Sequence, residues 1–138
     1  YLAAMQDKKA RTAACQKDHS LIQRFDTAHG LDRLVVHNGV AWFTGHSARP
    51  GYSTLEEQTQ AVVNRYDELF AQFGLKKKNI LSFNAYLADI ESIEEFNRVF
   101  YPWLEKDGCS AVGVCVAAKP AGKDNLLELQ LSVAADTI

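Results

Sequence analysis

The sequence lacks the features that mark membrane, secreted and metal-binding proteins. No uninterrupted apolar run approaches the roughly 18 residues that a transmembrane helix needs, and the first twenty residues contain no continuous apolar core of a signal peptide. The three cysteines, Cys15, Cys109 and Cys115, form no C-x-x-C pair, so we expect no disulfide framework and a reducing, cytoplasmic location. The four histidines have no paired spacing, so we expect no metal site.

Motifs for phosphate binding and for a serine nucleophile are also missing. The chain contains neither G-x-G-x-x-G nor G-x-x-x-x-G-K, the glycine-rich loops that surround phosphate groups. It contains no G-x-S-x-G elbow either. The formal net charge of −2 gives no electrostatic reason to bind nucleic acid or an anionic membrane. We therefore expect neither of these as a partner.

The length and composition are those of one globular domain. The chain has 138 residues, of which 47% are hydrophobic and 23% are charged. Residues 1–20 are polar, and we expect a flexible arm there, followed by a single domain over residues 21–138. Met5 is the only methionine, and a natural start at Met5 would make residues 1–4 a remnant of expression.

Three strands are expected in the first third of the chain. Residues 21–27 alternate roughly between apolar and polar and predict the first strand. Residues 33–37 and 40–44 are rich in β-branched and aromatic side chains and flank Asn38-Gly39. Asn-Gly is the strongest short hairpin signal, because both central residues of a type I′ turn need positive φ. These two segments should therefore pair as an antiparallel hairpin.

Two amphipathic helices are expected. The first should be capped within residues 53–54 and end at Gly74, with acidic residues in its first turn. Its apolar residues recur at helical spacing and include Ala61, Val62, Tyr66, Leu69, Phe70 and Phe73. The second should begin at Ser92 as N-cap, with Glu95 completing a capping box. Pro102 should kink this helix or shorten it.

Three further strands complete the predicted fold, at residues 80–87, 108–120 and 126–135. The stretch GCSAVGVCVAAKP over residues 108–120 is almost entirely small and apolar, which indicates a strand that is deeply buried or lines a cavity. The order of elements predicts an α+β fold, in which a six-stranded mixed sheet carries two helices on one face. The other face would then be buried most simply by self-association.

Glu128 is the residue most suggestive of chemistry, because it lies inside an otherwise apolar strand. A carboxylate there is unfavourable unless it is paired, exposed at an edge or functional. An ion pair or an edge position would explain it structurally, whereas a general acid or base that holds a water would explain it functionally. Cys109 and Cys115 are six residues apart on one predicted strand, and we expect both to be buried on the same face rather than to act as nucleophiles.

Several segments together resemble the RidA family, also called the YjgF or L-PSP endoribonuclease-like family. They are FTGH, EEQTQAVVNRYDELFAQFGL, NILSFNAYLADIESIEEFN and LELQLSVAA, and they occur in the family's order over about residues 21–135. The most specific matches are Glu57-Gln58-Thr59, Asn64, Leu69, Gly74, Leu87, Asp89 and Asn97. The resemblance implies a chorismate-mutase-like fold that forms a homotrimer, with a small-molecule ligand in the clefts between subunits.

The resemblance also implies a chemistry. Typical members hydrolyse reactive 2-imino acids, or their enamine tautomers, to 2-oxo acids and ammonia, and they use no cofactor. Carried over by position, Glu128 matches the glutamate that positions the attacking water. Thr44, Gly45 and Asn97 match residues that complete the substrate pocket, and His46 stands where many members have glutamine.

Two other family positions are altered in this chain. Ala111 stands where members carry the arginine that binds the substrate carboxylate, and Gly113 replaces a cysteine. Loss of a buried bidentate arginine would forfeit on the order of 3–5 kcal/mol of carboxylate binding, although Arg33 or Arg49 could supply a guanidinium from elsewhere. The sequence therefore leaves two functions open: an imine or enamine hydrolase with altered substrate preference, or a non-catalytic trimer that binds a metabolite or protein partner. The ribonuclease activity in the family's name is not expected from the charge pattern.

Overall fold

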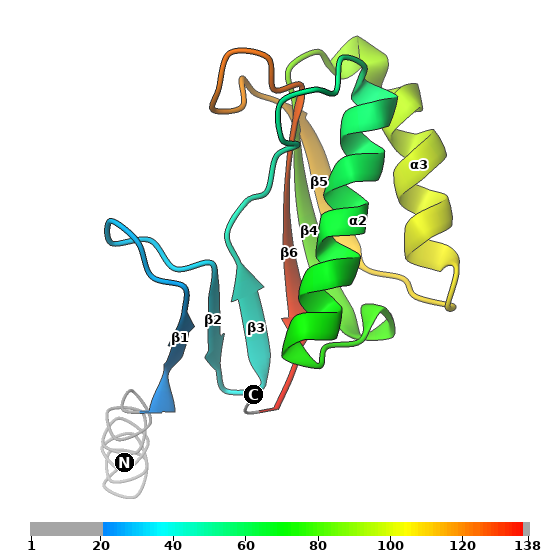
Figure 1. The fold of residues 1–138 in the computed structure, drawn as a ribbon. Coiled ribbons are helices and arrows are strands. Elements are labelled where there is room, and N and C mark those ends of the chain that lie inside the picture. Colours follow the sequence, from blue (N-terminus) through cyan, green and yellow to red (C-terminus); the bar gives the residue numbers. More distant parts are fainter. Residues whose placement is uncertain (1–20, 137–138) are drawn as a thin grey trace, which may run out of the picture.

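A computed structural model describes residues 21–136 of the chain (Figure 1). Six strands form one sheet in the order β1-β2-β3-β6-β4-β5. The β4–β5 pair is parallel, and the other neighbouring pairs are antiparallel. The elements along the chain are β1 (Gln23–Phe25), β2 (Leu34–His37), β3 (Val40–Phe43), α2 (Leu55–Phe73), η2 (Lys77–Asn79), β4 (Ile80–Leu87), η3 (Ile90–Ser92), α3 (Ile93–Glu105), β5 (Val112–Ala117) and β6 (Leu127–Ala134).

Both long helices lie on the same face of the sheet (Figure 1), which confirms the predicted α+β fold and its six-stranded mixed sheet. The homotrimer stays a prediction. The predicted arm over residues 1–20 lies outside the described residues. Within residues 21–136, no helix is long and apolar enough to cross a membrane.

The predicted hairpin is confirmed. β2 and β3 pair antiparallel, with His37 opposite Val40. The two residues between them, Asn38 and Gly39, have φ values of 49° and 79°. Both therefore adopt the left-handed conformation that a type I′ turn requires.

Both ends of α2 are also as predicted. The Thr54 side chain accepts a hydrogen bond from the backbone N–H of Glu57 at 3.1 Å, which satisfies one of the free donors of the first turn. At the other end, Gly74 has a φ of 69°, and its N–H donates to the carbonyl of Phe70.

The predicted capping box at α3 is wrong. Ser92 does precede the helix, but its side chain makes no capping hydrogen bond. Asp89 instead accepts a hydrogen bond from the N–H of Glu91 at 3.0 Å, so it caps the short turn η3 that leads directly into α3. Pro102 lies inside α3, and the helix ends at Glu105, less than a turn later.

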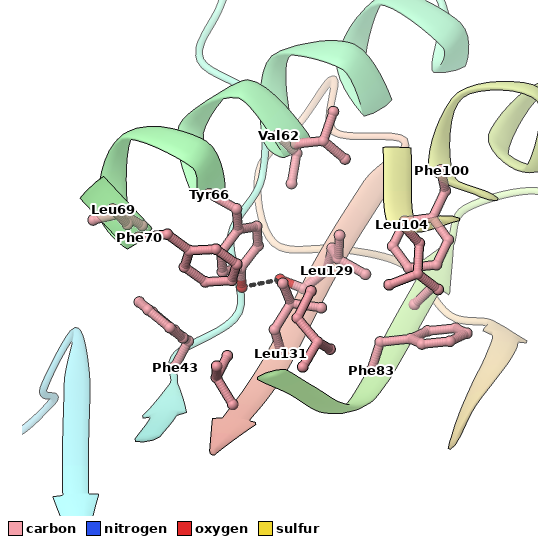
Figure 2. Packing of buried hydrophobic residues seen from close by; sticks show 14 of the residues in the cluster. Phe43, Val62, Tyr66, Leu69, Phe70, Phe83, Phe100, Leu104, Leu129 and Leu131 are labelled. Carbon is pink, nitrogen blue, oxygen red and sulfur yellow. Dashed lines mark hydrogen bonds between the residues drawn. The ribbon is translucent and has the colours of Figure 1, made fainter. Parts of the chain in front are cut away.

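The hydrophobic core lies between the sheet and the two helices. Leu127, Leu129 and Leu131 alternate along β6 and are 0% exposed. Figure 2 shows the last two of them between aromatic side chains of α2, including Tyr66, and those of α3, including Phe100. Each such leucine contributes roughly 1.5–3 kcal/mol through burial. This core fixes the register of β6, because a one-residue slip would exchange its two faces.

The residues between these leucines point to the face of the sheet that neither helix covers, which we call the open face. It carries Trp42 of β3, Ser82, Asn84 and Tyr86 of β4, Val112, Val114 and Val116 of β5, and Glu128, Gln130 and Ser132 of β6. Its centre is polar, and Asn84 donates a hydrogen bond to Gln130 at 2.8 Å there. Its flanks are apolar, since Trp42 and the three valines are between 43% and 74% exposed.

The strand predicted over residues 108–120 is shorter in the structure. β5 spans Val112–Ala117 at the edge of the sheet, so Cys115 lies in the strand and Cys109 precedes it. Both thiols are free, and both side chains belong to the core or pack against it. Burial raises the pKa of the Cys115 thiol, which disfavours the reactive thiolate.

Candidate functional site

Glu128 and Gly45 lie in direct contact where β6 passes the end of β3. A Cβ atom built on Gly45 would lie 2.8 Å from Cδ and 2.9 Å from Cγ of Glu128. A side chain at position 45 would therefore displace the Glu128 carboxylate. The structure thus brings together Thr44-Gly45 and Glu128, three of the residues that the sequence assigned to the site.

The Glu128 carboxylate has no partner within residues 21–136. It is half-buried, faces the open face and forms no ion pair or hydrogen bond with any residue in that range. Its neighbour on β4 is Tyr86, in the antiparallel register. Neither structural explanation of this acid holds. Glu128 forms no ion pair within residues 21–136, and the predicted edge position is wrong because β6 is a central strand.

Two side chains of the core hold the backbone on either side of this contact. The Tyr66 hydroxyl donates to the carbonyl of Leu129 at 2.8 Å and lies 3.4 Å from the carbonyl of Thr44. His46 Nδ1 lies 2.8 Å from the same Thr44 carbonyl. Because a carbonyl oxygen only accepts, Nδ1 carries the proton in this contact. Both strands that meet at Gly45 and Glu128 are therefore fixed from the helix side.

Burial tunes both of these groups. The His46 ring packs 5.0 Å from the Tyr66 ring, centroid to centroid. Desolvation lowers the pKa of His46, and the nearby guanidinium groups of Arg65 and Arg33 lower it further. Burial raises the pKa of Tyr66 well above its ordinary range, so its hydroxyl stays protonated. The pair therefore acts as a neutral hydrogen-bonding clamp on the backbone.

Ala111 and Gly113 lie far from Glu128 within one chain. Tyr86 pairs with both Glu128 and Val116, which places these two residues at the same level of the sheet. Ala111 is five positions before Val116, or about 17 Å along the strand direction at roughly 3.3 Å per residue. Ala111 packs against the core, and the Phe83 ring covers the helix side of Gly113.

Asn97 is also not beside Glu128, and the Arg33 guanidinium is engaged by another residue. Asn97 is half-buried on α3, and the sheet separates that helix layer from the open face. Arg33 lies across from Thr44, whose N–H donates to the Arg33 carbonyl at 3.0 Å, but its guanidinium pairs with Asp26 at 3.4 Å. Arg49 lies in the loop between β3 and α2, where it lines a cavity. Of the predicted site residues, Thr44 and Gly45 thus lie beside Glu128, and Asn97, Ala111 and Gly113 lie elsewhere in the chain.

The sequence pattern places Tyr66 only in the apolar stripe of its helix and does not predict where the His46 ring lies. A hydrogen bond of Tyr66 could have been expected, because a tyrosine at a buried helical position must find an acceptor for its hydroxyl. No comparable signal identified the carbonyl to which His46 donates. Within residues 21–136, no three His, Cys, Asp or Glu side chains gather in a way that could hold a metal ion.

The fold and this contact define a class: α+β domains with two helices on one face of a mixed sheet and an acidic side chain on the opposite face of a central strand. The chain belongs to the family described as Endoribonuclease L-PSP, whose model matches residues 21–135. The predicted RidA/YjgF membership is therefore confirmed.

Sequence relatives agree with this assignment. A RutC family protein of Haemophilus influenzae is 32% identical over 88 residues, which is 61% of this chain and 73% of that protein. A RutC family protein of Haemophilus ducreyi is 29% identical over 84 residues, or 61% of this chain and 72% of that protein.

Solved structures show the same fold. A YjgF family member of Neisseria meningitidis superposes with a TM-score of 0.76 at 26% identity, covering 83% of this chain and 95% of that one. A protein of unknown function from Yersinia pestis, of the conserved Rid family, superposes with a TM-score of 0.67 at 18% identity, covering 80% and 91%.

Proposed function

We propose that the protein is a cofactor-independent hydrolase, a deaminase, of small imine or enamine metabolites, and that Glu128 activates the attacking water. The observation that carries the proposal is the half-buried Glu128 carboxylate, which is unpaired within residues 21–136 and lies against Gly45. A carboxylate held without a counter-ion is available to accept a proton. The resemblance to imine hydrolases assigns this role to the same residue. We place the activity in the cytoplasm, where thiols remain reduced.

The chemistry requires only water and one proton carrier. Glu128 accepts a proton as the water oxygen bonds to the imine carbon, and it delivers this proton to the imine nitrogen to give a carbinolamine. Glu128 then takes the carbinolamine hydroxyl proton and passes it to the amine nitrogen, so the C=O bond forms as the C–N bond breaks with both bonding electrons leaving on ammonia. An enamine substrate first gains a proton at carbon and loses one from nitrogen to become the imine. Glu128 therefore acts as base and then as acid.

The position of the other predicted residues supports a pocket built from more than one subunit. Ala111 lies about 17 Å along the strand direction from the level of Glu128. A second copy that covers the open face would bring its own edge strand close to Glu128. The exposed valines of β5 and Trp42 supply apolar area for such a contact. We propose a homotrimer with its ligand in the cleft between subunits.

The proposed pocket differs in chemistry from one that contains an arginine at position 111. With Ala111 and Gly113 in its wall, the pocket would be wider and less cationic. It would therefore favour a neutral or bulkier imine over a small imino acid. Thr44 and Gly45 keep their expected binding roles beside Glu128 in this proposal, whereas Asn97 would have to reach the cleft from another subunit.

Release of ammonia from 2-iminobutanoate, generated in solution, tests the proposal. We expect measurable turnover by the parent protein and loss of it in Glu128→Ala. Ala111→Arg should raise turnover of this carboxylated imine in the assembled protein. Unchanged turnover in Glu128→Ala would show that this residue is not the base.

The second candidate is a non-catalytic trimer that binds a metabolite or regulatory partner in the same cleft. Its specific support is Ala111, since the chain has no guanidinium at the position that binds the substrate carboxylate in the enzymes it resembles. This candidate predicts that a specific metabolite raises the melting temperature by mass action while no imine is turned over. Imine turnover without any stabilising ligand would contradict it.

A further inference from the structure

A cavity of about 790 Å³ lies between two loops beside the start of β6. One loop, residues 48–53, connects β3 to α2, and the other, residues 122–126, connects β5 to β6. Both loops lie at the same end of the sheet (Figure 1). The volume falls within the range of about 300–1,000 Å³ that is usual for small-molecule sites.

Gln58 holds these two loops together. Its side chain is 2% exposed, and its Nε2 donates to the carbonyls of Tyr52 at 3.1 Å and Asp124 at 3.0 Å. Its Oε1 accepts a hydrogen bond from the N–H of Leu126 at 2.8 Å. All three partners line the cavity. Its walls are thus fixed by a buried amide on α2 rather than left to loop motion.

The cavity gathers two cations, Arg49 and Lys123, that form no ion pair within residues 21–136. The described residues include five arginines, and all except Arg49 form an ion pair within residues 21–136. Arg49 lines the cavity together with Lys123, which also has no ion-pair partner in that range. Asp124 is the single acid among the lining residues.

Part of the remaining wall is apolar. Tyr52, which is 45% exposed, and Leu126 both line the cavity. Leu126 is two positions before Glu128, which corresponds to about 7 Å along the strand. A ligand that reached from the cations past Leu126 would therefore approach the Glu128 carboxylate.

We propose that this cavity binds a small organic carboxylate, with its charged group on Arg49 and Lys123 and its carbon chain against Tyr52 and Leu126. A planar guanidinium binds a carboxylate through two parallel hydrogen bonds, and an ammonium adds a point charge. The choice of a carboxylate over another anion rests on the proposed function, because a bulkier imino acid whose carboxylate is not bound at position 111 could place this group, or that of its 2-oxo acid product, on Arg49 and Lys123. The two cations and the loops that Gln58 fixes do not depend on that function.

NMR titration of the full chain tests the proposal with three probes: 2-oxobutanoate, the neutral analogue 2-butanone and inorganic phosphate. We expect 2-oxobutanoate to shift amide signals of residues 48–53 and 122–126. Arg49→Gln and Lys123→Gln should each raise its Kd by roughly tenfold to a hundredfold. Arg98→Gln and Lys106→Gln remove the same charges from the exposed surface of α3 and its C-terminal end and should leave the Kd unchanged.

Several results would overturn the proposal. They are shifts that spread over other surfaces, equal binding of 2-butanone, tighter binding of phosphate than of 2-oxobutanoate, or a Kd indifferent to Arg49 and Lys123. The outcome is separable from that of the proposed function. Binding at the cavity with no imine turnover would support the site and refute the hydrolase, and Glu128-dependent turnover with no binding there would do the reverse.

Discussion

The ring of Phe83 occupies the space in which a side chain at Gly113 would lie. The two residues pair across β4 and β5, and a Cβ atom on Gly113 would be 2.5 Å from Cδ1 of the ring. Phe83 is held there by Phe100, whose ring centroid is 4.7 Å away. The absence of a side chain at position 113 is therefore part of the packing of this core.

Replacement of Gly113 by alanine should destabilise the fold by about 1–3 kcal/mol, because the buried Phe83 ring must move to make room. Urea unfolding of the parent and variant measures this difference. Phe83→Leu removes part of the ring, so the double variant should be more stable than the sum of the two single changes predicts. Additive effects would show that Phe83 and Gly113 do not compete for the same space.

Replacement of Gly45 by alanine should displace the Glu128 carboxylate and leave the fold intact. The new methyl group would meet the far end of a flexible side chain, so we expect a stability change below about 1 kcal/mol. The carboxyl carbon signal of Glu128 should shift in NMR spectra, and any turnover should fall. Ser47→Ala is the matched control. An unmoved Glu128 signal in Gly45→Ala would contradict the contact.

Replacement of His46 by glutamine should remove one component of the pH dependence of stability. The unfolded chain binds a proton at the ordinary pKa of 6.5, whereas burial lowers the pKa of the folded His46. Between these two pKa values the unfolded state binds more protons than the folded state. The contribution of His46 to the free energy of unfolding is therefore fully present above pH 6.5 and decreases as the pH falls through this window.

Urea unfolding at about pH 7.5 and about pH 5.5 measures the effect. His46→Gln keeps a donor for the Thr44 carbonyl and should lose less stability on acidification than the parent. His29→Gln makes the same change at an exposed position and should behave like the parent. Equal acid sensitivity of His46→Gln and the parent would refute the assignment.

An aspartate at Val114 should separate the subunits of the proposed trimer. This side chain is 51% exposed on β5, so a charge there disfavours burial against another copy without disturbing the core. Analytical ultracentrifugation should show the parent as a trimer and Val114→Asp as a smaller species. Lys119→Gln, in the loop after β5, makes the same change of one charge unit away from that face and is the control. A monomeric parent would contradict the proposed assembly.

Local rules predicted the frame of this protein well. Asn38-Gly39 forms the turn between β2 and β3, and Gly74 ends α2, as expected for residues that adopt positive φ. The cap of α3 was wrong because Asp89, three residues upstream, competes with Ser92. Local spacing holds no information about which of two nearby side chains reaches the free N–H groups.

The candidate site was predictable in its residue types and much less in its geometry. Glu128 was identifiable because a charged residue interrupts an apolar strand. The bonds of Gln58 to residues more than sixty positions away, and those of Tyr66, depend on how loops meet in space. The distance between Ala111 and the level of Glu128 follows from strand order, which the sequence does not specify.

The turnover number of Glu128→Gln is the most direct test of the central claim, since glutamine keeps the shape of the side chain and cannot accept the proton. With 2-iminobutanoate as substrate, kcat should fall by roughly a hundredfold to ten-thousandfold, while the melting temperature stays close to that of the parent. Ser132→Ala, on the same face of β6, should retain turnover. Parent-like kcat in a folded Glu128→Gln protein would contradict the account.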